Sequence, residues 1–133
     1  MPDAPATFEL KSTQSATLLR FEWVGVEQMV ATVETVGLSA STDVYTFMSG
    51  VPIDLFEAIA REWRGWQGPK QWESLEGELK LTATMDRTGH VSVQVELRRG
   101  GAWELRAWIV LEAGQLDAIA AQLRRFGSAG RAA

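Results

Sequence analysis

Few residues in the sequence could carry out catalysis. His90 is the only histidine, and the chain has no cysteine. A histidine can act as a general base near neutral pH, but it then needs a nucleophile or an orienting acid beside it. The sequence has no GxSxG elbow and no HExxH motif that would supply those groups. We therefore expect no enzyme, and we interpret His90 as a residue that caps a hairpin or bonds the neighbouring strand.

Carboxylates are the second group with catalytic potential. Glu73, Glu76 and Glu78 lie close together after a tryptophan-rich stretch, and paired carboxylates are typical of glycoside hydrolases. Adjacent glutamates on one face of a strand are more often a solvated row, which is the interpretation that we favour. The sequence also lacks a calcium-binding DxDxDG loop, a Walker A motif and a GxGxxG turn after a strand. It therefore predicts no metal site and no cofactor.

The tryptophans offer binding surfaces instead. Trp63, Trp66 and Trp72, three of the six tryptophans in the chain, lie within ten positions. Such a cluster either closes a core or presents an aromatic platform, because a large aromatic side chain gains much from burial. We expect the cluster mainly to close the core. In the alternative, Trp66 and Trp72 stand exposed near Arg64 and stack a small molecule or a carbohydrate.

A second aromatic candidate lies near the end of the chain. Apolar residues alternate with others between Trp103 and Leu111, and Trp108 falls on the row that should face solvent, beside Arg106. An exposed tryptophan next to an arginine is a combination enriched at the energetic centres of protein interfaces. The alternative is that a helix or a tail covers Trp108.

Alternation with a period of two predicts the strands that would position these residues. We predict strands at 8–12, 17–24, 26–36, 41–48, 75–85, 91–98 and 103–111. The strand at 75–85 has the clearest pattern, with an apolar residue or glycine at every odd position from Leu75 to Met85. The sequence Asp86-Arg87-Thr88-Gly89 predicts a hairpin turn directly after it.

Two amphipathic helices are predicted in addition. The first, residues 52–64, has an apolar stripe that includes Trp63, and Gly65 is suited to end it. The second, residues 114–126, has a similar stripe and should end at Gly127. The sequences FEAIARE and LDAIAAQ of the two helices lie sixty positions apart, which suggests that a βββα unit occurs twice.

These elements predict a single α+β domain. It should contain an antiparallel sheet of about six or seven strands with both helices on one face, because each helix has one apolar stripe and the best strands have one apolar face. The domain should span residues 8–127. Residues 1–7 and 128–133 are expected to be disordered tails.

Composition limits the classes of partner. With 17 acidic and 13 basic residues, the chain has a net charge of −4 and lacks the basic character that nucleic-acid binding requires. A basic protein partner would match that charge. The sequence shows no secretory signal and no apolar run of the ~20 residues that span a membrane. We expect a bacterial protein of the cytoplasm, without a nucleic-acid or membrane partner, and the sequence predicts no oligomeric state.

The tryptophan-rich stretch also carries a family resemblance. The motifs are WRGW at 63–66, SLEG at 74–77 and GHV at 89–91, together with Gly68, Trp72, Asp86 and Trp103. They resemble the signature of an uncharacterised bacterial domain family, a domain of unknown function. More distantly, the chain is similar to immunity proteins of the WapI type, which neutralise toxins delivered between competing bacteria. The resemblance implies no catalytic residue; it implies occlusion of a toxin by a rigid acidic face.

We therefore predict a non-enzymatic protein-binding module, similar to an immunity protein that occludes a bacterial toxin. The residues expected to contact a partner are Trp108, Arg106, Trp66, Trp72, Arg64, Glu76, Glu78 and His90. The alternative is a small-molecule or carbohydrate-binding domain that uses the tryptophan-rich turn. The two differ in shape, because a protein-docking surface should be flat and include Trp108, whereas a ligand site should be a pocket lined by Trp66 and Trp72.

Overall fold

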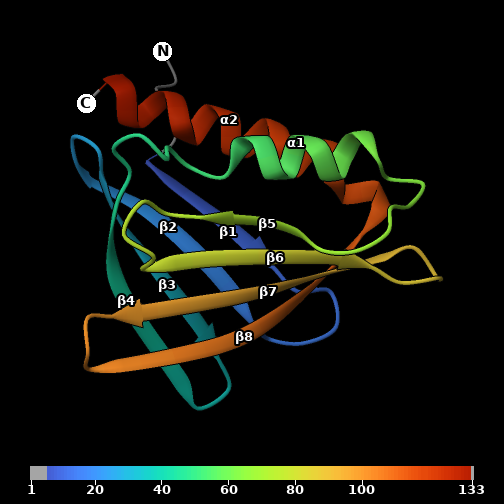
Figure 1. Ribbon diagram of the computed structural model, residues 1–133, viewed down its shortest axis with the longest axis horizontal. Helices are drawn as coiled ribbons and strands as arrows, with labels where there is room; N and C mark the ends of the chain where they lie inside the picture. The colour runs from blue at the N-terminus through green and yellow to red at the C-terminus, as the bar shows by residue number, and fades with distance from the viewer. Residues whose placement is uncertain (1–5, 133) are drawn as a thin grey trace.

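Eight strands and two α-helices make up residues 6–132, the part of the chain that the computed structural model describes (Figure 1). The first sheet has the order β1 (Thr7–Lys11), β2 (Leu18–Gly25), β3 (Gln28–Thr35) and β4 (Leu38–Tyr45). The second has the order β5 (Lys70–Glu73), β6 (Leu79–Met85), β7 (His90–Arg99) and β8 (Trp103–Glu112). Every strand pairs antiparallel with its neighbour in sequence, so each sheet is a meander.

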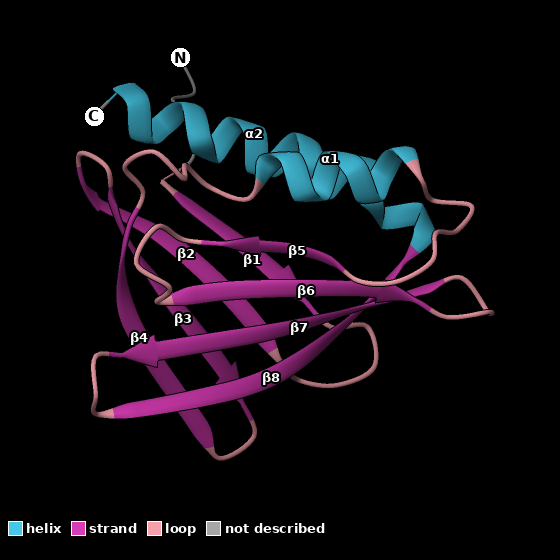
Figure 2. Ribbon diagram, in the orientation of Figure 1, coloured by secondary structure: helices cyan, strands magenta, loops and turns pink. Residues whose placement is uncertain are grey.

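Alternation within the strands directs one row of side chains from each sheet inward. In the first sheet Phe21 lies opposite Ala31, and both are fully buried. In the second sheet Val93 lies opposite Ile109, and both are again fully buried. Figure 2 shows the sheets in two layers whose strands cross at a large angle. The apolar rows of both sheets therefore meet in one continuous core.

Both helices lie side by side along the end of the molecule where β1 and β5 are found (Figure 1). α1 (Ile53–Arg61) packs against α2 and β5, and α2 (Leu116–Ala132) packs against α1, β1 and β2. A short 3-10 turn, Ala113–Gln115, joins β8 to α2. The stripes that enter the core are Leu55, Phe56 and Ile59 from α1, and Leu116, Ile119, Ala120, Leu123 and Phe126 from α2.

The element order is four strands and a helix, twice. The repeated unit is therefore ββββα and not the predicted βββα, and the duplication of an ancestral unit stays a prediction. The helix that ends each half lies against the first strand of the other half, because α1 contacts β5 and α2 contacts β1. The two halves are thus interlocked around the common core.

The predicted α+β class, antiparallel pairing and two helices are confirmed, but a single sheet of six or seven strands is wrong. The strands are divided into two sheets of four, because β4 pairs with β3 and β5 pairs with β6, and α1 separates them in the chain. An alternating strand looks the same whether its apolar face meets a helix or another sheet. The pattern could therefore identify strands without showing how they are grouped.

Several boundaries also differ from the prediction. α1 ends at Arg61, before the predicted stop at Gly65, and this leaves Trp63 51% exposed instead of in the core stripe. The predicted strand at 75–85 begins only at Leu79, and Leu75 is 54% exposed. The strand β5 was expected to be part of a turn. Residues 128–132, predicted as a disordered tail, belong to α2, whereas residues 1–5 of the other tail lie outside the described residues.

Glycine in α2 permits close packing and does not end the helix. A Cβ on Gly127 would lie 2.9 Å from Ile53 Cδ1, and a Cβ on Gly130 would overlap the ring of Trp23. Trp23 in turn stacks on Phe126, with ring centroids 4.9 Å apart, and its indole N–H donates to the Phe126 carbonyl at 2.7 Å. The last turns of α2 are therefore fixed to β2 through Trp23. No helix within residues 6–132 has the length and apolar character needed to cross a membrane.

Candidate protein-binding surface

Trp108 lies on the outer face of the second sheet, in the edge strand β8. Its neighbours Ala107 and Ile109 point into the core, whereas Trp108 is 55% exposed. Directly opposite, on β7, lies the polar residue Gln94. The alternation of β8 thus places a large aromatic ring on a solvated sheet surface, as predicted from the sequence. The ladder with β7 fixes the backbone that carries this exposed ring.

Two charged pairs lie on the same face as Trp108, between it and the β7–β8 turn. Arg106 is exposed and its Nε lies 3.4 Å from a Glu96 carboxylate oxygen, across the β7–β8 ladder. The next pair along β8 joins Glu104 to Arg98 at 3.5 Å. These pairs are open to solvent and contribute little to stability. They do provide charges of both signs beside an apolar ring, which is the composition of a specific interface.

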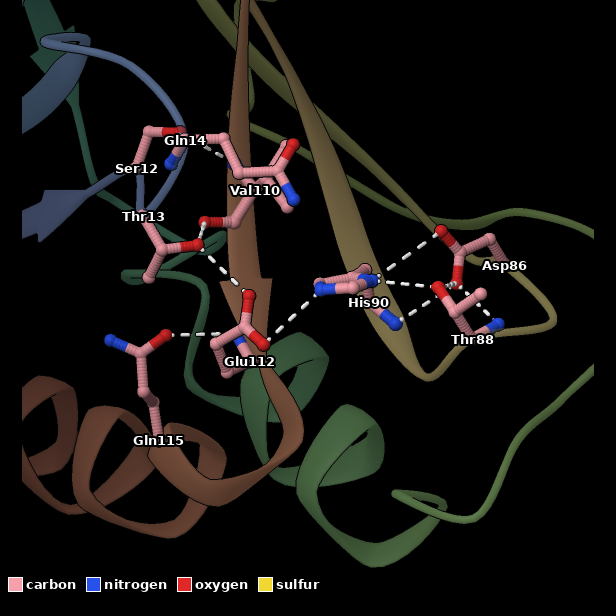
Figure 3. Close-up of polar contacts among 9 residues, drawn as sticks. All are labelled: Ser12, Thr13, Gln14, Asp86, Thr88, His90, Val110, Glu112 and Gln115. Atoms are coloured by element: carbon pink, nitrogen blue, oxygen red, sulfur yellow. Dashed lines mark hydrogen bonds and ion pairs between the residues drawn. The ribbon is translucent and has the colours of Figure 1, made fainter.

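The backbone of β8 is partly unpaired on the side away from β7. At one end, the Val110 N–H donates to Ser12 Oγ at 3.0 Å, and the Val110 carbonyl accepts from the Thr13 N–H at 2.9 Å (Figure 3). Both groups therefore point away from β7. Because the register is continuous, the residues of the same row, Trp108, Arg106 and Glu104, also point their N–H and C=O groups outward. No described residue is bonded to these outward groups.

Trp66 and Trp72 lie elsewhere and are mostly structural. Both are half-buried and pack against the core, Trp72 from β5 opposite the buried Leu81. The Nζ of Lys70 lies 5.4 Å from the centroid of the Trp66 ring. The Trp66 indole nitrogen is buried without a hydrogen-bond partner among the described residues. These two tryptophans therefore help to close the core, as we expected from the sequence.

Arg64 and Trp63 form the exposed part of the tryptophan-rich stretch. The guanidinium carbon of Arg64 lies 5.1 Å from the centroid of the Trp63 ring. Both side chains are exposed in the segment after α1. Trp63, and not Trp66 or Trp72, thus provides the solvent-facing ring of this stretch.

Glu76 and Glu78 do not form the predicted row on a strand, because both lie in the turn before β6. Glu78 accepts hydrogen bonds from Ser74 Oγ at 2.7 Å and from the Tyr45 N–H at 3.2 Å. It therefore links the turn to β4. Glu76 is exposed at the rim of a groove of about 470 Å³ whose lining includes Tyr45, Glu78 and Arg98.

His90 joins a network at the β6–β7 hairpin (Figure 3). Its Nδ1 lies 2.7 Å from Thr88 Oγ1, and its Nε2 lies 3.2 Å from a carboxylate oxygen of Glu112 on β8. The Thr88 hydroxyl and the backbone N–H of His90 donate to Asp86, and these bonds hold the pKa of the Asp86 carboxyl below its usual value. His90 thus supports the hairpin and bonds the neighbouring strand, as predicted.

Four of the surface hollows within residues 6–132 bear on the predicted sites. The largest, about 750 Å³, lies between the β2–β3 turn, the β4–α1 loop and α2, and its lining includes Trp23, Met48 and the ion pair Glu57–Arg124. Neither Trp66, Trp72 nor His90 lines any of the four. In the described chain no group of three or more histidine, aspartate or glutamate side chains could hold a metal ion.

The structure thus brings only part of the predicted site together. Arg106 and Trp108 share one face with Glu96, whereas Trp66 and Trp72 belong to the opposite edge of the sheet or the segment before it. Sequence analysis did not identify Glu104 or the outward backbone groups of β8. The pairing of Glu104 with Arg98 has a weak sequence signal, because the two residues flank the Gly100-Gly101 hairpin turn.

Comparison with known proteins identifies a family whose function is unknown. A family model described as a family of unknown function, DUF6228, matches residues 11–129. This match confirms the predicted relation to an uncharacterised domain family. No match was found among curated proteins.

Proposed function

We propose that this chain, which belongs to the DUF6228 family of unknown function, is a non-enzymatic protein-binding module. Its partner docks on the outer face of the second sheet, around Trp108 and Arg106. The observation that carries the proposal is the 55% exposure of Trp108 in the middle of a regular strand. The strand backbone is already ordered before binding, so only the side chains lose freedom when a partner docks, and tryptophan and arginine are enriched at binding hot spots.

The proposed partner is a basic protein domain. The net charge of −4 favours association with a positively charged partner. In an immunity-like role, the sheet would cover the active site of a bacterial toxin in the cytoplasm, and Trp108 would fill a pocket on it. The exposed indole with charges of both signs beside it supports such occlusion, because standard protein interfaces combine a central aromatic anchor with a polar rim.

The alternative, a small-molecule or carbohydrate-binding domain at the tryptophan-rich turn, has less support. Stacking on a sugar or another ring requires an accessible aromatic face in a concave site. Trp66 and Trp72 are half-buried against the core and line none of the four hollows. We therefore place the partner at β8.

Capture from the proteome of the source bacterium would test this function. The purified chain, Trp108→Ala and Trp63→Ala would each be immobilised, and the retained proteins compared quantitatively. Trp63 is a matched control because it is 51% exposed, close to the 55% of Trp108, and lies after α1. We expect a basic protein that Trp63→Ala retains and Trp108→Ala loses by roughly 30-fold or more, the effect of a hot-spot residue. Equal retention by both variants would refute the proposal.

A further inference from the structure

We propose that two copies of the chain pair through β8. The two β8 strands run antiparallel about a two-fold axis at Leu105, and they join two four-stranded sheets into one sheet of eight strands. This inference concerns the edge of β8, and it holds or fails independently of the partner proposed for the face around Trp108.

The edge strands of the two sheets differ in length and in how far other elements cover them. β1 has five residues and lies against α2, and β5 has four residues and lies against α1. Short or covered strands are the usual protection of sheet edges. β8 has ten residues and forms a continuous ladder with β7, with no bulge. Figure 1 shows β8 as the outermost strand of its sheet, with no strand of that sheet beyond it.

On β4, the other long edge strand, side chains from the second sheet and its turns form hydrogen bonds with the outward backbone groups. The Tyr45 N–H donates to Glu78, and Arg99 donates to the Ser41 carbonyl at 3.4 Å. On β8 such contacts among the described residues are confined to its last residues: Ser12 and Thr13 bond Val110, and the Glu112 N–H donates to Gln115 Oε1 at 2.8 Å. The outward groups of Glu104, Arg106 and Trp108 have no bonding partner there. β8 is therefore the one edge along residues 6–132 that is long, regular and open.

The alternation of charge across the second sheet favours a second copy of the chain as the strand that pairs with β8. Glu73, Lys80, Glu96 and Arg106 lie opposite one another on β5, β6, β7 and β8, so the signs alternate across the sheet and end with a positive residue at the edge. Placing Glu104 of a second copy opposite Arg106 continues that alternation. In the second copy, Arg98 on β7 lies opposite this Glu104 and has the opposite charge, so the alternation continues into the second sheet of that copy. By symmetry the same pair forms twice.

Other antiparallel registers fit less well. Shifting the second copy by two residues places Arg106 of one copy opposite Arg106 of the other. Like charges directly opposite each other destabilise a sheet. Shifting it by four places Glu104 opposite Val110, whose outward groups are already bonded to Ser12 and Thr13. The register with Glu104 opposite Arg106 avoids both problems. It also lets these residues exchange about four backbone hydrogen bonds in total.

The pairing would leave Trp108 accessible. In this register Trp108 lies opposite Ala102 of the second copy, and both Trp108 rings remain on the same outer face. The two rings would be about 20 Å apart along the strands, from the rise of about 3.3 Å per residue. The dimer would therefore present two copies of the proposed binding surface side by side.

Light scattering coupled to gel filtration tests the pairing. The wild-type chain should have twice the 14.7 kDa of one chain. Glu104→Arg and Arg106→Glu should each raise the dissociation constant by roughly tenfold or more, because each places like charges opposite one another at two positions. An equal mixture of the two variants should recover the dimer, since the mixed pair restores both oppositely charged contacts. A monomeric wild type, or a mixture that stays monomeric, would overturn the proposal.

Single cysteines would test the register directly, because the chain has no cysteine of its own. Leu105 lies opposite itself at the axis, where Cα atoms of a non-hydrogen-bonded pair are about 4.5 Å apart, within disulfide range. Leu105→Cys should therefore form a covalent dimer on mild oxidation. Arg106→Cys is the matched control, because its two copies would be more than about 7 Å apart. Stronger cross-linking of Arg106→Cys, or a mixed complex with an extended segment of another protein at this edge, would contradict the pairing.

Discussion

Trp23 and Trp108 are both strand tryptophans, yet the fold uses them in opposite ways. Trp23 lies on the inward row of β2, stacks on Phe126 and donates its indole N–H to the Phe126 carbonyl. Trp108 lies on the outward row of β8, where it is 55% exposed. One ring joins α2 to β2, whereas the other faces solvent.

The difference follows from the parity of each position in its strand. Phe21 and Trp23 share the row that includes the buried side chains of β2, whereas Trp108 alternates with the buried residues Ala107 and Ile109. Side chains at successive positions point to opposite faces of a sheet. A tryptophan on the core row is thus accounted for by packing. A tryptophan on the solvent row requires another explanation, and we propose partner binding.

The largest effect that separates the two residues should come from Trp23→Ala. Removing the ring leaves Phe126 without its stacking partner and opens space beside Gly130. We expect the free energy of unfolding to fall by about 3 kcal/mol, at the low end for tryptophan because Trp23 is only half-buried. Urea denaturation followed by circular dichroism measures this. A loss similar to that of the exposed control Trp63→Ala would mean that Trp23 does not fix α2 to the sheet.

Trp23→Phe should have an intermediate effect. Phenylalanine keeps an aromatic ring against Phe126 but cannot donate to its carbonyl, which now accepts at 2.7 Å from the indole. We expect a loss of about 1 kcal/mol, the net value of one hydrogen bond. The same denaturation experiment shows whether stacking or the hydrogen bond dominates. If Trp23→Phe destabilises as much as Trp23→Ala, the hydrogen bond matters more than the stack.

The smallest effect on stability should come from Trp108→Ala. Its ring is mostly in solvent and covers no buried residue of the core row, so we expect a change within about 0.5 kcal/mol. Thermal melts of this variant and of Trp63→Ala should be nearly superimposable with those of the wild type. A loss of 2 kcal/mol or more would show that the indole has a packing role, and it would remove the distinction between the two tryptophans.

The local structure was largely predictable from the sequence. Alternation identified the inward residues of β2, β3, β6, β7 and β8, and the helical stripes of α1 and α2. It also identified Trp108 as exposed, because parity along a strand is a local property. β5 was missed because four residues that include lysine and glutamate, after Pro69, have no strand signal of their own.

Other features depend on contacts between distant segments and could not be predicted. Gly127 was expected to end α2, but the helix continues past it and packs closely against Ile53 at this position, which only the folded structure shows. The division into two sheets and the open edge of β8 depend on strand order, which alternation does not encode. Trp63 was assigned to the core because the helical period was extended beyond Arg61, where α1 ends.

Phe126 also bears on how the protein is made. The centroid of its ring lies 6.4 Å from that of Phe8 and 6.1 Å from that of Phe21, so β1 and β2 are covered by a residue that is synthesised about a hundred positions after them. Domains fold as units during synthesis, and this one cannot complete its core until α2 has been synthesised. A prematurely terminated chain would expose the apolar rows of β1 and β2, and cellular proteases could recognise it as incomplete.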